Sequence, residues 1–196
     1  MTAFSQSEIY LVRHGETAWN ASGHYQGKLD SPLTSKGVAQ AQACGRQLAA
    51  VSADIDILVA SPLGRARETT KIISSFGNFP DAIWDDRIAE VSLGSWDGLT
   101  QVDIDAQWPG MLDGSTPSDW FFRSPDGETY DHAAARASQW LGSLQGVVLA
   151  VSHGLIGRLV RGAYLGLTKD DALELPVPQD MIWRLADGRI DPITPA

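Results

Sequence analysis

The stretch Ile9-Tyr10-Leu11-Val12-Arg13-His14-Gly15 decides the fold that this sequence predicts. Its first four residues are apolar, as in a strand that is covered on both faces of a parallel sheet. The next three residues change abruptly to a cation, an imidazole and a glycine. Because ligand sites of parallel α/β sheets lie just beyond the carboxyl ends of the strands, this stretch predicts a buried strand that delivers Arg13 and His14 to a site.

Further apolar runs of strand length alternate with helical patterns along the rest of the chain. We expect strands at residues 55–60, 147–151 and 181–185, and helices at residues 35–51 (behind an N-cap at Thr34), 64–75, 128–144 and 155–165. Alternating strands and helices are typical of a parallel sheet. The sequence therefore predicts an α/β fold of three layers, with a mostly parallel sheet and helices on both faces.

The length of 196 residues predicts a single domain, residues 1–196. Residues 94–127 break the alternation, because they are rich in Gly, Pro, Asp and Trp and have only a weak helical pattern at 99–107. We interpret them as an insertion, or lid, over one end of the sheet. Its aromatic residues either wall a leaving-group pocket or pack a local core; they are Trp108, Trp120, Phe121 and Phe122.

Composition excludes several classes of protein. There are 24 acidic residues against 15 Lys and Arg, which gives a net charge of -9, the wrong sign for a nucleic-acid partner. No apolar run is long enough to span a membrane, and residues 1–8 lack the basic and apolar parts of a targeting segment. Cys44 is the single cysteine, so it forms no intramolecular disulfide and is expected to be a core residue. We expect a cytoplasmic protein.

Polar residues gather where three of the expected strands end. Arg13-His14-Gly15 follows the first strand, Ser61 to Arg65 the second, and Ser152-His153-Gly154 the third. Guanidinium groups match phosphate oxygens, a glycine lets a ligand approach the backbone, and helix N-termini add N–H donors. The pattern predicts an anion site that contains two imidazoles.

The two histidines have two other possible roles. His14 and His153 could be hydrogen-bonded residues at strand ends with no further role, although two His-Gly pairs at equivalent places favour function. They could instead bind a metal together with a carboxylate. Two guanidinium groups would repel a cation, and no His-x-x-x-His spacing is present, so we expect neither a metal nor a bound cofactor.

The same residues resemble the signature of the histidine phosphatase superfamily, which includes the cofactor-dependent phosphoglycerate mutases and many small-molecule phosphatases. The resemblance runs in the family's order through residues 11–20, 25–37, 61–69, 90–98, 125–128 and 151–154. It implies a phosphoglycerate mutase-like fold and a phosphomonoesterase that forms a phosphohistidine intermediate without a metal.

The resemblance also implies roles for individual residues. His14 would be the nucleophile, Arg13 and Arg65 the phosphate clamps, His153 a further phosphate contact and Glu90 the proton donor. Other positions match residues that line the pocket in relatives, with turn or cap roles as the alternative; they are Asn20, Gln26, Gly27, Ser61 and Gly154. Arg158 is expected either in the pocket or on a helix surface, and Arg67 on the surface.

The sequence departs from the family pattern in three places. His24 stands where many relatives have arginine, so the resemblance gives no support for a phosphate contact there. The insertion has Arg123 alone among six aspartates, where mutases carry a basic cluster, which favours a phosphatase over a mutase. The chain also ends soon after its last strand, without the longer tail typical of mutases. We expect hydrolysis of a small phosphorylated metabolite. The alternative function is that of a phosphoglycerate mutase, and a third is that of an inactive adaptor that binds a phosphorylated ligand. The sequence does not decide the substrate or the oligomeric state, and a homodimer is one possibility.

Overall fold

The computed structural model describes residues 7–116 and 118–195, and a six-stranded sheet forms its centre, in the order β3-β2-β4-β1-β5-β6. The strands are β1 (Ser7–Arg13), β2 (Ile57–Ala60), β3 (Ala82–Trp84), β4 (Gly146–Ser152), β5 (Ile182–Ala186) and β6 (Arg189–Ile193). Strands β1 to β4 are mutually parallel, whereas β5 runs antiparallel to β1 and β6 antiparallel to β5. The predicted mostly parallel sheet is confirmed, with an antiparallel pair at one edge.

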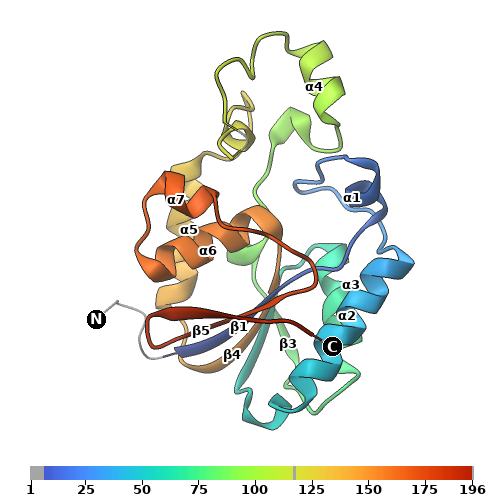
Figure 1. The fold of residues 1–196 in the computed structure, drawn as a ribbon, viewed down its shortest axis with the longest axis vertical. Coiled ribbons are helices and arrows are strands. Elements are labelled where there is room, and N and C mark those ends of the chain that lie inside the picture. The colour runs from blue at the N-terminus through green and yellow to red at the C-terminus, as the bar shows by residue number, and fades with distance from the viewer. Residues whose placement is uncertain (1–6, 117, 196) are drawn as a thin grey trace.

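Helices cover both faces of the sheet, which confirms the three layers (Figure 1). One face packs against α2 (Ser35–Ala49) and α3 (Gly64–Ser74), and the other against α5 (Tyr130–Gly142) and α6 (Gly154–Leu165). Strand β1 shows why: Ile9 and Leu11 enter the core under α5 and α6, while Val12 enters the core under α2 and α3. Strands buried on both faces need the continuous apolar run found there.

The remaining helical segments are short. They are α1 (Ala18–Ser22), α4 (Gln101–Gln107), α7 (Lys169–Leu173) and the 3₁₀ turns η1 (Ser52–Asp54), η2 (Asp86–Ile88), η3 (Gly94–Trp96) and η4 (Trp120–Phe122). The expected N-cap at Thr34 is confirmed, because its side chain accepts a hydrogen bond from the Gly37 amide at 3.0 Å. Cys44 is buried, as expected.

Residues 94–127 lie beyond the carboxyl end of the sheet, around α4 (Figure 1). Leu93, Trp96, Ile104 and Trp120 form a small core there, against which Trp108 packs. Phe122 instead packs on the main core. The sequence left open whether these aromatic residues line a pocket or pack a local core. Trp108, Trp120 and Phe122 pack in hydrophobic cores, and Phe121 packs there and also lines the cavity described below.

Within the described residues, no helix combines the length and the apolar composition that crossing a bilayer requires. Residues 1–6, on which part of the expectation about targeting depends, lie outside the described residues.

Candidate active site

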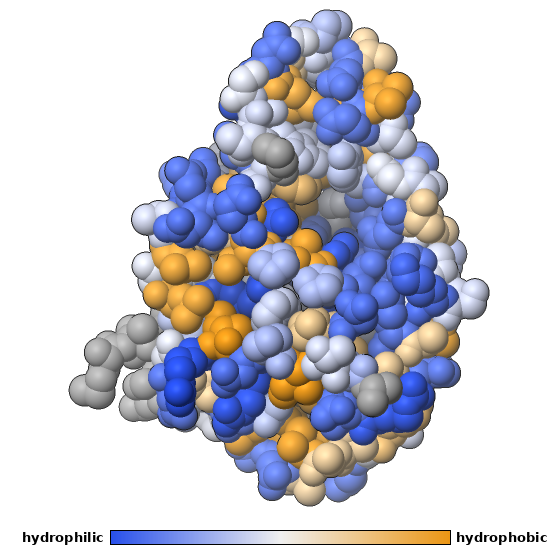
Figure 2. Space-filling view, viewed as in Figure 1, coloured by the Kyte–Doolittle hydropathy of each residue, from blue (hydrophilic) through white to orange (hydrophobic). Residues whose placement is uncertain are grey.

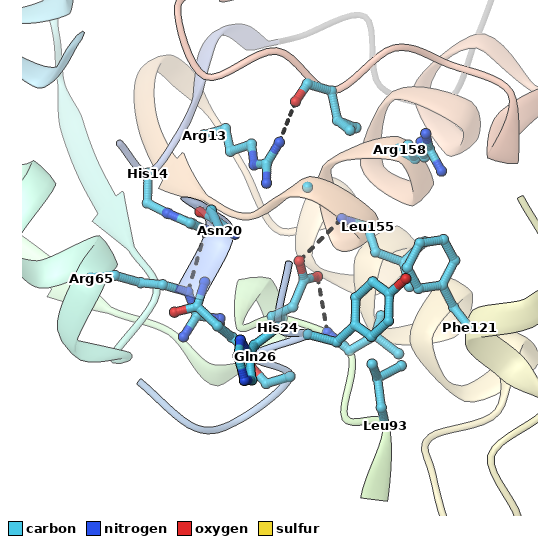
Figure 3. Close-up of a pocket in the computed structure, with 16 residues that line it drawn as sticks. Arg13, His14, Asn20, His24, Gln26, Arg65, Leu93, Phe121, Leu155 and Arg158 are labelled. Carbon is cyan, nitrogen blue, oxygen red and sulfur yellow. Dashed lines mark hydrogen bonds between the residues drawn. The ribbon is translucent and has the colours of Figure 1, made fainter. Parts of the chain in front are cut away.

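Residues at the strand ends and residues 20–27 line a cavity of about 140 Å³, to which residues 94–127 contribute Phe121. Figure 2 shows the surface hollowed between the lobe that carries α4 and the body of the molecule. The sequence-predicted residues that line the cavity are Arg13, His14, Asn20, Gln26, Gly27, Arg65, Glu90 and Gly154. Figure 3 shows that His14 and Arg65 lie at one end, with Arg158 and Phe121 toward the other. Residues far apart in the chain therefore meet at the predicted edge of the sheet.

His14 is held as a neutral imidazole. Its Nδ1 atom lies 2.8 Å from the Gly15 carbonyl oxygen, an acceptor, so Nδ1 carries the proton and Nε2 keeps its lone pair. Complete burial, reinforced by the positive charges of Arg13 and Arg65, lowers the pKa of His14 well below its usual value. A neutral ring is the form of histidine whose Nε2 can attack phosphorus, provided that Nε2 first gives up the hydrogen bond that it accepts from Arg65.

Arg65 is a buried arginine that lies against this lone pair. Its Nε donates to Nε2 of His14 at 3.3 Å, and its terminal nitrogens donate to the Asp30 carboxylate at 2.8 Å and the Gly27 carbonyl at 2.9 Å. Gly27 has a φ of +48°, and a side chain there would meet the Asp97 carboxylate. Arg65 therefore fixes the nearby loop while it lies against the nucleophile.

Arg13 contributes a second buried positive charge. One terminal nitrogen donates to the Val177 carbonyl, and Nε is buried without a partner among the described residues. Burial lowers the pKa of Arg13 to about 10, so the guanidinium stays charged at neutral pH. A Cβ on Gly154 would lie 3.3 Å from the Arg13 guanidinium carbon, which explains the need for glycine after His153.

Glu90 lines the same cavity, and its carboxylate caps α6. It accepts hydrogen bonds from the amides of Leu155 at 3.2 Å and Ile156 at 3.0 Å. Asp30 in the same way accepts from the first amides of α3, those of Gly64 and Arg65. The expectation that these helix N-termini offer N–H donors to phosphate is wrong for these four amides, because a carboxylate already satisfies the positive end of each helix dipole.

His153 and Ser61 do not line this cavity; they lie behind it. Nε2 of His153 is 2.6 Å from Oγ of Ser61, and the two imidazole centroids of His153 and His14 are 5.1 Å apart. Burial, with the nearby charge of Arg65, lowers the pKa of His153 well below its usual value. Ser61 therefore contacts the second histidine rather than the cavity.

Asn20 and Gln26 combine the two roles that the sequence left open. Oδ1 of Asn20 caps α1 by accepting from the Thr17 amide at 3.2 Å, and it also accepts from Gln179 at 2.8 Å. Oε1 of Gln26 accepts from Ser31. Each side chain keeps an NH₂ group that can donate within the cavity.

Two observations concern residues whose place the sequence did not decide. Val177 lines the cavity, and Gln179 binds Asn20, yet both come from an irregular segment with no motif to mark it. Arg158 lines the cavity, whereas Arg67 is exposed and stacks over Trp84 at 4.1 Å, as expected. In the part of the chain that the structure describes, no three His, Cys, Asp or Glu side chains gather as metal ligands would.

Comparison with known proteins places these observations in context. The sequence model described as "Histidine phosphatase superfamily (branch 1)" matches residues 9–186. The probable phosphoglycerate mutase GpmB of Proteus mirabilis is 35% identical over 168 residues, covering 82% of this chain and 75% of the relative.

Solved structures are similar over nearly the whole chain. YhfR of Bacillus stearothermophilus is 28% identical with a TM-score of 0.81, and the match covers 96% of each chain. The mycobacterial glucosyl-3-phosphoglycerate phosphatase Rv2419c, solved with VO3, is 26% identical with a TM-score of 0.79, covering 96% of this chain and 99% of the other. The similarity therefore extends across the sheet, the helices and the insertion.

Proposed function

The chain belongs to the histidine phosphatase superfamily, branch 1, and on that premise we propose that it hydrolyses small phosphomonoesters through a phosphohistidine on His14. The observation that carries the proposal is the buried, neutral His14, whose Nε2 lone pair lies beside Arg65 in a cavity that also contains Glu90. Nucleophile, positive charge and carboxyl group then have distinct places around one phosphate.

In the first half-reaction, Nε2 of His14 attacks the phosphorus and the bond to the ester oxygen breaks. Arg13 and Arg65 stabilise the negative charge on the oxygens of the transferred group, with Asn20 and Gln26 as further donors. This step requires Glu90, which caps α6 as a carboxylate, to take up a proton beforehand; its carboxyl group then gives that proton to the leaving oxygen, so the alcohol leaves neutral and Glu90 becomes a carboxylate again. The phosphoryl group stays on His14.

In the second half-reaction, a water molecule takes the place of the alcohol. The Glu90 carboxylate removes a proton from the water as its oxygen attacks phosphorus, and the bond to Nε2 breaks. Inorganic phosphate leaves, Glu90 is protonated again and His14 returns to its neutral form. His153 flanks His14, with the two ring centroids 5.1 Å apart, and in this proposal it is a further contact of the phosphoryl group. The guanidinium groups supply the positive charge that a metal would bring, so the reaction needs none.

Phosphoglycerate mutase is the second candidate, because it is the name given to the similar Proteus mirabilis protein. A mutase must hold a polyanionic intermediate while it reorients. Among the described residues of the insertion only Phe121 lines the cavity, and Arg123 instead donates to the carbonyls of Asp113 and Gly114. The six aspartates of residues 94–127 do not line the cavity either, so they would not repel a bound polyanion directly. The stronger argument against a mutase is that these residues bring no basic side chain to the cavity.

The test is a phosphoenzyme trap combined with substitution of His14. We expect rapid denaturation in alkaline detergent during turnover of a labelled phosphomonoester, in the presence of EDTA, to leave a phosphoprotein whose label is stable in alkali and is lost in acid. His14→Ala should remove both this label and nearly all turnover, while His132→Ala, an exposed histidine outside the cavity, keeps both. Full activity of His14→Ala would contradict the proposal, and loss of turnover with EDTA, restored by one divalent ion, would favour a metal-dependent reaction.

A further inference from the structure

The cavity extends beyond the phosphate end. In Figure 3, Arg158 and Phe121 lie on the side away from His14 and Arg65, so the alcohol part of a bound ester would extend toward them. The proposed reaction assigns no role to the residues in this half of the cavity. We therefore ask which leaving group their side chains could bind.

Arg158 is the one guanidinium of this half, and most of its donors are unused. Its Nε donates to the Leu175 carbonyl at 2.7 Å, which fixes the direction of the side chain. Across the described residues, its terminal nitrogens have no hydrogen-bond or ion-pair partner. Burial lowers the pKa of Arg158, and the negative charge of Glu174 partly opposes this. The Glu174 carboxylate itself accepts a hydrogen bond from Ser118 Oγ at 2.6 Å. A half-buried guanidinium held by Nε, with its planar fork unpaired, suits a ligand with two oxygens in one plane.

The wall beside Arg158 is apolar. Phe121, Leu93 and Leu155 line it together with the ring of Tyr25, whose centroid lies 6.3 Å from that of Phe121 in an edge-on arrangement. Such a wall favours a flat ring or a compact hydrocarbon over a polyhydroxylated group, since sugar hydroxyls would lose their hydrogen bonds to water there. The whole cavity, phosphate end included, measures about 140 Å³, which matches a compact leaving group such as a single ring.

The charges in the cavity favour a single additional negative charge on the substrate. Arg13 and Arg65 lie at the phosphate end, where Arg65 also pairs with Asp30 at 2.8 Å, and Arg158 is the remaining guanidinium that lines the cavity, with its terminal nitrogens open to one more anionic group. A carboxylate brings one charge and a planar pair of oxygens. A second phosphate would bring up to two, with no further cation of the insertion among the lining residues to balance it.

We propose that Arg158 binds a carboxylate on the leaving group, and that the substrates are phosphomonoesters of compact, apolar or aromatic hydroxy acids. This inference rests on the proposed phosphatase function. It makes Arg158 a specificity-determining residue: the guanidinium recognises the carboxylate, and the apolar wall holds the carbon skeleton between the two charged ends.

The test compares three esters on the wild-type enzyme and on matched arginine variants. Phenyl phosphate, 3-carboxyphenyl phosphate and 1,3-phenylene bisphosphate share one ring and differ in the second group. We expect the wild type to favour the carboxylated ester over phenyl phosphate by about tenfold or more in kcat/KM, mainly through KM. Arg158→Gln should abolish that ratio, Arg158→Lys should keep part of it, and Arg67→Gln, an exposed arginine outside the cavity, should keep all of it.

Each other result contradicts the inference in a recognisable way. An equal kcat/KM for the carboxylated and plain esters on the wild type would show that nothing recognises the carboxylate. An equal loss on both esters in Arg158→Gln would assign Arg158 to the reacting phosphate. Preference for the bisphosphate would identify a second phosphate as the ligand. His14→Ala, run in parallel, separates these results from failure of the phosphatase chemistry, since only that failure would leave this variant active on all three esters.

Discussion

Oγ of Ser61 lies 2.6 Å from Nε2 of His153, and this contact joins two strand ends that are 92 residues apart in the chain. Ser61 follows β2 and His153 follows β4, which are neighbours in the sheet. The hydroxyl also accepts from the Leu63 amide at 3.3 Å, so its own position is fixed. Because His153 is buried with no partner on Nδ1, Ser61 is the only side chain among the described residues that is hydrogen-bonded to its ring.

Ser61→Ala is therefore expected to lower activity without preventing folding. Removing the hydroxyl leaves a buried ring nitrogen without its partner, at a cost of about 1–3 kcal/mol, and frees the ring to tilt. We expect kcat to fall roughly tenfold or more, with less change in KM, measured by steady-state hydrolysis of p-nitrophenyl phosphate. Ser143→Ala is the control, since its hydroxyl caps the end of α5. Equal kinetics in the two variants would remove the positioning role from Ser61.

His14 and His153 should remain neutral well below the pH at which free histidine becomes charged. Burial lowers the pKa of each, and the charge of Arg65 adds to the effect. Their ring nitrogens, observed by 15N NMR, should show neutral imidazole at pH 6, with the proton of His14 on Nδ1; a one-histidine peptide serves as the reference. Charged rings at pH 6 would contradict the neutral nucleophile.

The same shifts fix the sign of a stability effect. A histidine whose folded pKa is lowered binds its proton more readily in the unfolded chain, so acid favours unfolding. As the pH falls below about 6.5, each such histidine should cost up to about 1.4 kcal/mol per pH unit. The slope of unfolding free energy against pH, from urea denaturation between pH 7 and 5, should therefore be shallower in His153→Gln than in the wild type.

The central part of the fold could be predicted from the sequence because burial leaves a strong pattern. Strands β1 and β4 are covered on both faces, and their continuous apolar runs were found. Strand β3 was missed because it has three residues on the sheet edge, where Ile83 is 56% exposed. Strand β6 was missed although Asp187-Gly188, both with positive φ, forms the tight turn typical of a hairpin. Pro192 argued against a strand here, because proline lacks a backbone N–H and is tolerated in a strand only at the edge of a sheet, where β6 lies.

Some residues of the candidate site could likewise be predicted from the sequence, and others could not. Residues at strand ends could be placed because topology alone brings parallel strand ends together. The capping of α6 by Glu90 and of α3 by Asp30 could not be foreseen, because both carboxylates come from loops distant in sequence. Val177 has no signal at all: its backbone carbonyl binds Arg13, and a carbonyl is present at every residue.

Arg136 should support the segment that carries Glu90. Its guanidinium pairs with Glu128 at 2.7 and 2.8 Å, and it also donates to the carbonyls of Arg87 and Ala89, the latter just before Glu90. Arg136→Met leaves the partly buried Glu128 with exposed His132, at 2.7 Å, as its remaining side-chain partner, so we expect a loss of about 1–3 kcal/mol in unfolding free energy, together with a lower kcat. Arg123→Met removes a partly exposed pair with Asp119 and should cost less than about 1 kcal/mol.

The Arg136 effect should depend on pH in one direction. Burial raises the pKa of Glu128, but the hydrogen bonds and charge of Arg136 outweigh it and lower the pKa below the usual value. A lowered carboxyl pKa adds stability above the unfolded value, and this is lost as the pH falls through the folded value. The difference between wild type and Arg136→Met should therefore shrink below about pH 4.5. A pH-independent difference would show that packing, not charge, causes it.

Glu90→Gln should separate the capping role of Glu90 from its proposed chemistry. The amide oxygen can still accept from one of the two α6 amides, but the NH₂ group replaces the oxygen that accepts from the other and the negative charge at the helix N-terminus is lost, so stability should fall by about 0.5–2 kcal/mol. Turnover of alkyl phosphates should fall far more than that of p-nitrophenyl phosphate, whose good leaving group needs little protonation. Similar losses on both substrates would leave Glu90 with the capping role alone.

Hydrolysis should exceed phosphoglycerate interconversion by a wide margin. A mutase keeps its phosphoryl group from water and holds a bisphosphorylated intermediate with several cations beyond the transfer site. Beyond Arg13 and Arg65, the cavity is lined by one further guanidinium, that of Arg158, and by the ionisable side chains of His24 and Glu90, while residues 94–127 contribute Phe121. One guanidinium can pair with a carboxylate but not also with a second phosphate.

The two reactions can be measured together by 31P NMR, with and without 2,3-bisphosphoglycerate. The spectra follow the release of phosphate from 3-phosphoglycerate and the formation of 2-phosphoglycerate. We expect release to dominate and the bisphosphate to give no activation. Efficient interconversion that depends on the bisphosphate would replace the phosphatase with a mutase while leaving the phosphohistidine on His14 in place.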